Sequence, residues 1–216
     1  MTIWEVYEQY RIMPNLRLHQ LRVAAVAREL AHALRADADL VTKAALLHDM
    51  GNIMKSDFSQ FPPEFYGDHD LSYWELVKKD YAATYGRDEH EATDAIAKEM
   101  GMGQEVIELI GSMGFGRIES IYLSDNLELK ICEYADQRVA PYGITSIFER
   151  LEEGRRRYES RTEAESDYGS DLYRQRVSLV LELEQKLFNG LLITPEMLTE
   201  ESLAGAIESL REYVIA

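Results

Sequence analysis

The chain has 216 residues, of which 46% are hydrophobic, and it carries a formal net charge of −16 at pH 7. This length and composition suit one domain, or one domain with a helical extension, and they exclude a disordered chain. The negative charge argues against extended DNA or RNA as a partner, because affinity for a phosphate backbone comes from lysine and arginine. A small phosphorylated ligand remains compatible with it, since a local site can be positive on an acidic protein.

Three features of the sequence favour a cytoplasmic protein. Cys132 is the only cysteine, so an internal disulfide is impossible. The first ten residues lack the basic start and the apolar run of a signal peptide. The longest apolar stretches fall far short of the roughly 20 residues that cross a bilayer, so no membrane association is expected.

The first part of the chain is predicted to be helical, because no sustained alternation of polar and apolar residues indicates a sheet. A helix is expected over 18–34, where apolar residues recur at three- and four-residue steps along one face. A nearly apolar helix follows over 40–49, with Asp39 as its cap and Gly51 as a stop signal. The prolines and the glycine within 55–70 predict a loop or a broken helix.

Further helices are predicted for the middle and the end of the chain. Their expected ranges are 71–84, 88–100, 103–112, 127–139, 145–159, 169–189 and 199–214. Three glycines predict a flexible turn over 111–116, and 160–168 is expected to be a surface linker. Together these elements predict an all-α fold, with a helical core over 1–150 and a C-terminal helical extension over 151–216 packed on it.

Four polar side chains occupy positions where helical periodicity predicts burial: His19, His48, Asp49 and Asp136. A buried carboxylate is costly unless it is paired or bound to a metal ion. Two imidazoles and two carboxylates form a suitable ligand set for a divalent ion, which could be Mn, Fe, Co, Ni, Zn or Mg. Adjacent helical residues point about 100° apart, so His48 and Asp49 can share an ion that lies off the end of their helix.

The same residues are also compatible with purely structural roles. His48 could be an ordinary core residue beside an Asp49 that caps the helix end. Asp136 could form a buried salt bridge with Arg138 or Lys130.

The order and setting of the four residues resemble the HD-domain superfamily of metal-dependent phosphohydrolases. The matching segments, within roughly residues 10–150, are NLRLHQLRVAAVA with His19, AALLHDMGNIMK with His48 and Asp49, and CEYADQRV with Asp136. The resemblance implies an all-α bundle in which these four residues hold one firmly bound divalent ion. It also implies hydrolysis of a phosphomonoester or phosphodiester, in a nucleotide or a similar small phosphorylated metabolite.

The resemblance implies further residues at the catalytic cleft. Asp49 would orient the attacking water as well as bind the metal, Lys55 would neutralise phosphate charge, and His90 would face the substrate or support a weaker second ion. A second histidine that the family places near 110–114 is missing here, which favours a single metal. Arg17 and Arg138 lie near ligand positions and could also neutralise phosphate charge, and Asn52 could hold a water or a metal ligand.

A second His-Asp dipeptide, His69-Asp70, provides an internal comparison. It lies in a loop with no apolar helix before it, so it is not expected to hold the main metal. Cys132 is interpreted as a small core residue and His32 as structural or surface. The tyrosine-rich segment 66–85 could stack on a nucleobase, although aromatic residues at helical spacing more often belong to a core.

Two other functions stay open. The protein could keep the metal as a structural element and act as a non-catalytic ligand-binding or signalling protein. It could instead be a helical interaction protein that docks through residues 145–216. The sequence is compatible with a homodimer formed through that region.

Overall fold

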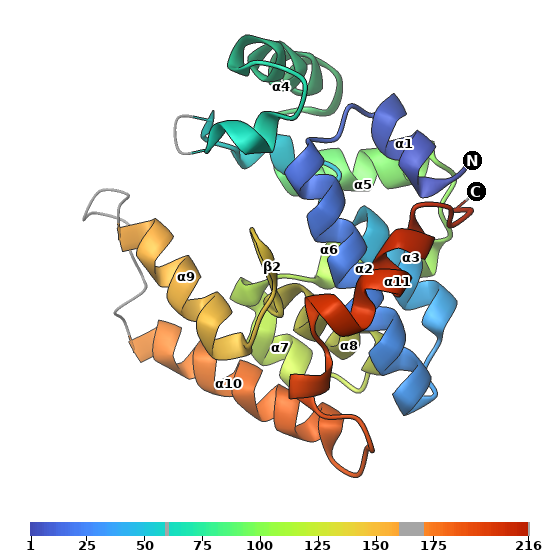
Figure 1. Cartoon of the computed structure of the whole chain (residues 1–216), viewed down its shortest axis with the longest axis vertical. Helices are drawn as coiled ribbons and strands as arrows, with labels where there is room; N and C mark the ends of the chain where they lie inside the picture. Colours follow the sequence, from blue (N-terminus) through green and yellow to red (C-terminus); the bar gives the residue numbers. More distant parts are fainter. Residues whose placement is uncertain (59–60, 160–170, 216) are drawn as a thin grey trace.

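Helices make up most of the structure, a computed structural model that describes residues 1–58, 61–159 and 171–215 (Figure 1). In chain order the elements are α1 (Ile3–Gln9), α2 (Pro14–Leu34), α3 (Ala38–Leu47), η1 (Asn52–Lys55), η3 (Pro63–Tyr66), α4 (Leu71–Tyr85), α5 (Glu89–Glu99), α6 (Gln104–Ser112), η4 (Phe115–Arg117), α7 (Ile118–Leu123), α8 (Leu127–Gln137), β1 (Val139–Ala140), β2 (Gly143–Ile144), α9 (Ile147–Glu159), α10 (Asp171–Phe188), η6 (Pro195–Met197) and α11 (Glu200–Leu210). The predicted all-α fold is confirmed. None of the described helices is long and apolar enough to span a bilayer.

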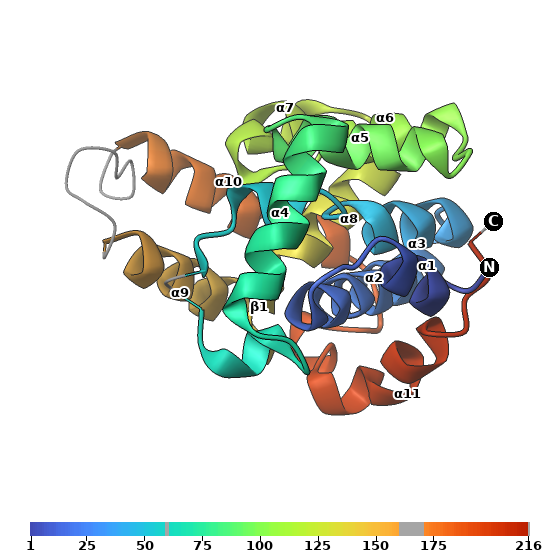
Figure 2. The same cartoon turned by 90° about the horizontal axis from the view of Figure 1, so that it is seen from above.

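Three helices at the centre of the molecule, α2, α3 and α8, carry the core. They pack against one another, while α6 covers α3 on one side and α11 crosses α2 on the other (Figure 2). Within α2, the side chains of Val23, Ala24, Val26 and Ala27 are fully buried. Because α2 is covered on several sides, it is apolar over more of its circumference than a surface helix, and its alanines let the neighbouring helices approach closely.

Local hydrogen bonding sets the starts of α2 and α3. α2 begins at Pro14 and not at residue 18 as predicted. Proline is well suited to the first position of a helix, because the amide hydrogen that it lacks would have no partner within the helix there. Asp37 caps α3, and its carboxylate accepts a hydrogen bond from the Leu40 amide at 2.9 Å. Asp39, the predicted cap, lies inside the first turn and pairs with Lys43 at 2.7 Å.

Some elements are not predicted by the periodicity of the sequence. α1 and α7 have only 7 and 6 residues, so their apolar pattern is too short to recognise. The β1–β2 hairpin is equally short, with Val139 paired to Ile144 in antiparallel register. α6 continues through Gly111, so the turn expected over 111–116 begins only at Met113.

The C-terminal helices pack on the rest of the chain in two places. α10 lies along α7 and α8, and α11 lies across α2 (Figure 1). The end of the chain returns to its start, where Val214 and Thr2 form an isolated antiparallel bridge. α9 spans the predicted domain boundary, and the linker predicted over 160–168 lies outside the described residues. The division into a core over 1–150 and an extension over 151–216 stays a prediction.

Candidate metal centre

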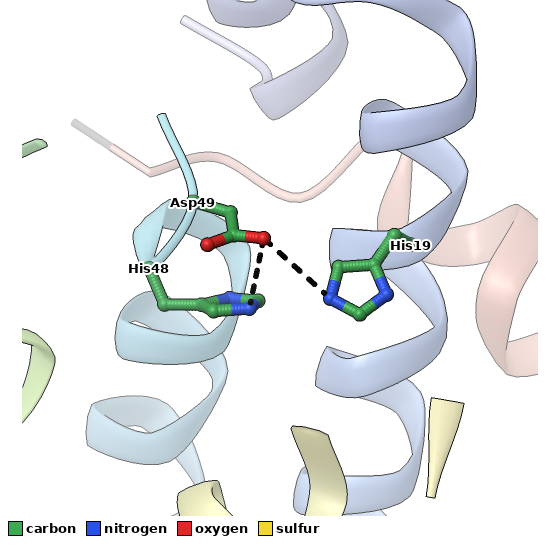
Figure 3. A group of neighbouring side chains, drawn as sticks. All are labelled: His19, His48 and Asp49. Atoms are coloured by element: carbon green, nitrogen blue, oxygen red, sulfur yellow. Dashed lines mark ion pairs between the residues drawn. The ribbon is translucent and has the colours of Figure 1, made fainter. Parts of the chain in front are cut away.

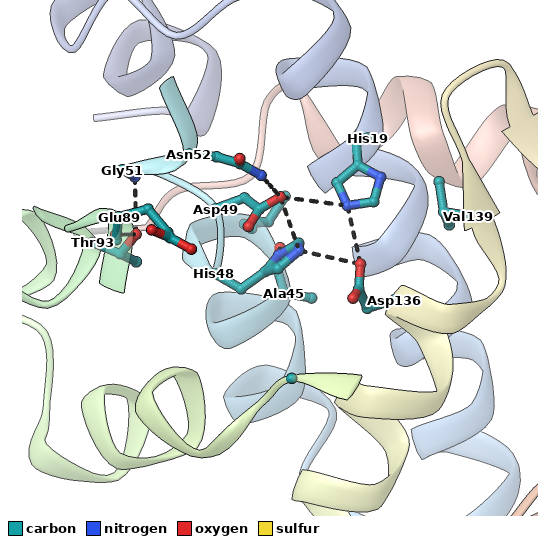
Figure 4. Close-up of polar contacts among 12 residues, drawn as sticks. His19, Ala45, His48, Asp49, Gly51, Asn52, Glu89, Thr93, Asp136 and Val139 are labelled. Carbon is teal, nitrogen blue, oxygen red and sulfur yellow. Dashed lines mark hydrogen bonds and ion pairs between the residues drawn. The ribbon is translucent and has the colours of Figure 1, made fainter. Parts of the chain in front are cut away.

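The four predicted metal ligands, here called the metal-binding group, come together where α2, α3 and α8 meet. Figure 3 shows the two histidines with Asp49, and Figure 4 also shows Asp136. His19 projects from α2, and Asp136 lies near the end of α8. His48 and Asp49 follow directly after α3. His19 Nε2 lies 3.1 Å from Asp136 Oδ1 and 3.7 Å from Asp49 Oδ2. His48 Nε2 lies 3.5 Å from Asp136 Oδ1 and 3.8 Å from Asp49 Oδ2, so all four side chains converge on one point.

The end of α3 explains how two adjacent residues reach the same point. His48 keeps helical backbone angles as the last half-turn of α3, and Asp49 lies in the turn that follows. Figure 3 shows both side chains on the side of α3 that faces His19. Side chains that leave a continuing helix at consecutive positions would diverge by about 100°, whereas the helix end lets these two face a common position.

A backbone carbonyl of α3 fixes the orientation of the His48 ring. Its Nδ1 donates a hydrogen bond to the Ala45 carbonyl at 2.7 Å, so the neutral ring keeps its proton on Nδ1 and a lone pair on Nε2. Nε2 is buried and has no hydrogen-bond partner among the described residues. A buried polar atom without a partner costs free energy, and a histidine held through one nitrogen with the other facing carboxylates is typical of a metal ligand.

The donor set fits one divalent ion. The ligand atoms of His19, His48 and Asp49 all lie within 4.8 Å of one another. Two atoms bonded to one ion at about 2.1 Å can be at most about 4.2 Å apart, and the four nitrogen–oxygen distances within the metal-binding group satisfy that limit. Imidazole nitrogens and carboxylate oxygens suit several divalent ions, so the donors do not select among Mn, Fe, Co, Ni, Zn and Mg.

Opposite charges within the metal-binding group stabilise one another. Burial by itself lowers the pKa of His48, but Asp49 and Asp136 outweigh it and raise that pKa to about 9. Burial opposes ionisation of Asp136, yet the hydrogen bond to His19 and the positive charges of both histidines bring the pKa of this carboxyl well below its ordinary value. The pKa of Asp49 is also lowered, because His48, Lys55 and His19 outweigh its burial. Since metal ligands must be deprotonated, binding of an ion displaces a proton from this group.

A cavity of about 530 Å³ opens onto the metal-binding group. Lys55 and His90, the other predicted catalytic residues, line it together with Asn52 and all four predicted ligands. Apolar side chains form another part of its wall: Phe61, Phe65, Ile110, Met113, Phe115 and Tyr173. In the described part of the chain, no tyrosine of segment 66–85 lines the cavity. The cavity therefore combines a charged end with an apolar wall, as ligand sites commonly do.

Lys55 and His90 are more exposed than the metal-binding group, with 52% and 64% of their side chains accessible to solvent. Glu89 lies near both, with its Oε1 3.9 Å from Lys55 Nζ and 3.8 Å from His90 Nε2. His90 is in the first turn of α5, where its amide donates to the capping Asp88. The cluster of potential metal ligands found among the described residues consists of His19, His48 and Asp49 and includes neither His90 nor Asp136. The roles of Lys55 and His90, and that of Asp136 as a ligand, stay predictions.

Arg17 and Arg138 do not line the cavity, so the expectation that they add positive charge to it is wrong. Arg17 donates to the Ile12 carbonyl at 2.7 Å, and its guanidinium lies over the Trp4 ring. Arg138 is only 3% exposed and donates to several backbone carbonyls. Each arginine is two residues from a predicted ligand, and a step of two residues turns a helical side chain by about 200°. Arg150 from α9, which sequence reasoning missed, lines the cavity instead.

α5 supports the segment that follows the His-Asp pair. The Gly51 amide donates to Thr93 Oγ1 at 2.9 Å (Figure 4). A side chain at Gly51 would collide with the backbone of α5, beginning with the Glu89 carbonyl. Gly51 therefore permits α5 to approach the segment after α3 closely. From the sequence alone, Gly51 is predicted only to end the helix. Next to it, Asn52 Nδ2 donates to Asp49 Oδ2 and holds that carboxylate in place.

The remaining candidates lie away from the cavity. His69 stacks on Tyr73 with ring centroids 3.7 Å apart, and Asp70 caps α4 by accepting from the Tyr73 amide at 2.9 Å. Neither residue of this second dipeptide lines the cavity. Cys132 is fully buried in the core, and His32 is exposed, as predicted.

Comparison with protein families agrees with this geometry. The family described as HD domain matches residues 17–140, which is more than half of the chain and includes the whole metal-binding group. No curated protein and no solved structure matched the chain. Three findings lead to one conclusion: the order of His19, His48-Asp49 and Asp136 in the sequence, their convergence at one end of a cavity, and the family match. The chain belongs to the HD-domain superfamily of metal-dependent phosphohydrolases.

Proposed function

We propose that the chain is an enzyme that hydrolyses a phosphomonoester or phosphodiester bond in a nucleotide or a similar small metabolite. Membership of the HD-domain superfamily supports metal-dependent phosphohydrolysis. The observation that carries the proposal for this chain is the buried Nε2 of His48, which faces Asp49 and Asp136 without a hydrogen-bond partner at the charged end of the cavity (Figure 4).

In the proposed reaction, the metal-binding group holds one divalent ion. Bound there, such an ion would supply Lewis-acid chemistry and would make a water more acidic near neutral pH. Asn52 fixes the orientation of the Asp49 carboxylate through Oδ2. Asp49 can then orient the attacking water by accepting a hydrogen bond from it, which contributes to catalysis through positioning.

Lys55 provides positive charge for the phosphoryl group that is transferred. Its ammonium lies 3.9 Å from Glu89, beyond hydrogen-bond distance, so it can turn toward a substrate. Charge stabilisation of this kind acts on the transition state of phosphoryl transfer. His90 lines the same cavity and faces the substrate in this proposal.

The apolar wall accommodates the organic part of the substrate. Phe61 and Phe65 form an edge-to-face pair with ring centroids 5.7 Å apart, and both line the cavity. Aromatic rings of this kind can pack against a planar group such as a nucleobase. A net charge of −16 opposes long polyanions, so the proposed partner is a small phosphorylated molecule.

The test is an assay of metal-supplemented protein on a panel of nucleotides, phosphomonoesters and phosphodiesters. Asp49→Ala and Asp136→Ala should lose turnover while circular dichroism shows that both variants remain folded. His69→Gln is the matched control, because it alters the second His-Asp dipeptide, and it should keep full activity. Full activity in Asp49→Ala and Asp136→Ala would show the proposal to be wrong. Stoichiometric metal without turnover on the panel would favour a non-catalytic binding protein.

A further inference from the structure

One lysine and one arginine line the cavity within the part of the chain that the structure describes. They are Lys55 from η1 and Arg150 from α9. Arg150 is largely buried, with 21% of its side chain accessible. Its position in the cavity wall follows from the packing of α9 against β1 and α8, which brings a residue outside the HD motifs to the cavity that opens onto the metal-binding group.

Arg150 and Lys55 contact residues at different ends of the metal-binding group. Its Nε donates to the Val139 carbonyl at 2.9 Å, and Val139 is three residues after Asp136. In Figure 4, Val139 and Glu89 lie at opposite ends of the polar group, with the histidines and aspartates between them. Glu89 marks the side of Lys55, because the two side chains are 3.9 Å apart. The residues that Arg150 and Lys55 contact therefore lie at opposite ends of the group, and both cations line the cavity that opens onto it.

The two cavity cations are less tightly paired than Lys43 and Arg22 are. Lys43 and Arg22 have carboxylate partners at 2.7 and 2.8 Å. Arg150 pairs with Glu153, whose carboxylate lies 3.4 Å from Nη1. With Nε bound to a carbonyl and Nη1 only weakly engaged, the guanidinium keeps hydrogen-bond donors for a ligand.

We propose that Arg150 binds a phosphate oxygen of the substrate, as a specificity residue that complements Lys55 across the metal-binding group. The inference rests on the proposed function and adds to it the residue that recognises the anion from α9. The planar guanidinium of arginine matches phosphate better than a lysine ammonium does, because it offers parallel donors in a fixed geometry. The Val139 carbonyl holds this fork in place before the ligand arrives, so little side-chain entropy is lost on binding.

The experiment measures binding of inorganic phosphate and of pyrophosphate to the metal-loaded protein by titration calorimetry. Arg150→Gln should bind at least one of the two anions roughly tenfold to a hundredfold more weakly, since a hydrogen bond between charged groups is lost. Weaker phosphate binding would assign Arg150 to the reacting phosphoryl group. Weaker pyrophosphate binding alone would assign it to a second phosphate of the substrate. Metal content, measured on the same samples, should not change.

The control for Arg150→Gln is Arg155→Gln, which makes the same charge change on the same helix. Arg155 pairs with Glu152 at 3.0 Å and does not line the cavity. This control should bind both anions as the unmodified protein does. Unchanged binding of both anions by a metal-loaded Arg150→Gln would overturn the inference.

A second pair of variants keeps the inference testable if Arg150→Gln fails to fold or loses metal. Glu153→Gln leaves Arg150 in place and removes its weak carboxylate partner, so anion binding should become roughly two- to fivefold tighter. Glu152→Gln on the same helix is its control and should change nothing. Unchanged or weaker binding by Glu153→Gln would count against the inference.

These measurements separate failure of the inference from failure of the proposed function. If anion binding depends on Arg150 but no substrate on the panel is turned over, the anion site stands and phosphohydrolysis is wrong. If substrates are turned over and Arg150→Gln binds both anions normally, phosphohydrolysis stands and the role of Arg150 is wrong.

Discussion

The same dipeptide occurs twice in this chain, and the two copies are used in different ways. His48 has 6% of its side chain exposed and lies in a group with a second histidine and two carboxylates. His69 is exposed and stacks on Tyr73, with ring planes 16° apart. One dipeptide ends an apolar helix in the core, and the other precedes a surface helix.

The two aspartates show that different causes can lower the pKa of a carboxyl group. The pKa of Asp49 is lowered against the effect of burial by the positive charges of His48, Lys55 and His19. The pKa of exposed Asp70 is lowered by hydrogen bonds from the Ser72 side chain and the Tyr73 amide. The first arrangement collects ligand atoms around one position, whereas the second only starts a helix. The dipeptide itself therefore carries no function without its tertiary surroundings.

The largest expected difference between the two dipeptides is in metal affinity. His48→Gln should weaken metal binding by more than about a hundredfold, because loss of a mere outer-shell partner already costs tenfold to a hundredfold. His69→Gln should retain metal as the unmodified protein does. Elemental analysis after dialysis against a weak chelator measures both. Equal metal content in the two variants would remove the distinction between the two dipeptides.

The next largest difference concerns stability against pH in chelator-treated protein. The pKa of folded His48 is about 9, above its ordinary value of 6.5. Because the pKa is raised in the folded state, protonated His48 contributes its full stabilisation below pH 6.5. This contribution to the free energy of unfolding is lost as the pH rises through 9. The loss should reach at most about 3 kcal/mol in the free energy of unfolding.

Urea unfolding between about pH 6 and pH 10 measures this contribution. His48→Gln should flatten the decline of unfolding free energy over that interval, and His69→Gln should leave it unchanged. A decline of the same size in both variants would mean that another group is responsible.

Gly51, which follows the first dipeptide, should also be sensitive to substitution. In Gly51→Ala the new methyl group would lie 2.8 Å from Ala92 Cβ and from the Thr93 amide nitrogen, so α5 must move. We expect a loss of about 1–3 kcal/mol in the free energy of unfolding. Gly111→Ala is the control, because nothing lies within 4 Å of its added methyl group and alanine favours a helix by up to about 1 kcal/mol. Chemical denaturation compares them, and similar stability of the two variants would contradict the close approach at Gly51.

The smallest effect is expected at the second dipeptide. Asp70→Ala removes the cap of α4 and should lower the free energy of unfolding by about 1 kcal/mol. Metal content and turnover should not change, since Asp70 does not line the cavity. Thermal unfolding and the activity assay test both parts. Loss of metal in this variant would show that the second dipeptide is connected to the metal-binding group.

The sequence by itself determined the parts of this protein that depend on local patterns. The long helices α2, α3 and α8 are predictable because their apolar residues repeat with the helical period over several turns. The four residues of the metal-binding group are predictable because polar side chains on such buried faces need partners. Short elements such as α1, α7 and the β1–β2 hairpin escape this reasoning, since a pattern of a few residues fits more than one structure.

Only the tertiary structure decided which other side chains reach the cavity. Arg17 and Arg138 are close to ligands in sequence, but each leaves its helix in another direction and is bound elsewhere. Arg150 lies outside the motifs and on a later helix, and the packing of α9 beside β1 brings it to the cavity wall. The same holds for the His-Asp pairs, because burial and neighbouring charges come from helices that meet only in the folded chain. Sequence spacing predicts side-chain direction within one helix, whereas the composition of a site depends on how several helices pack.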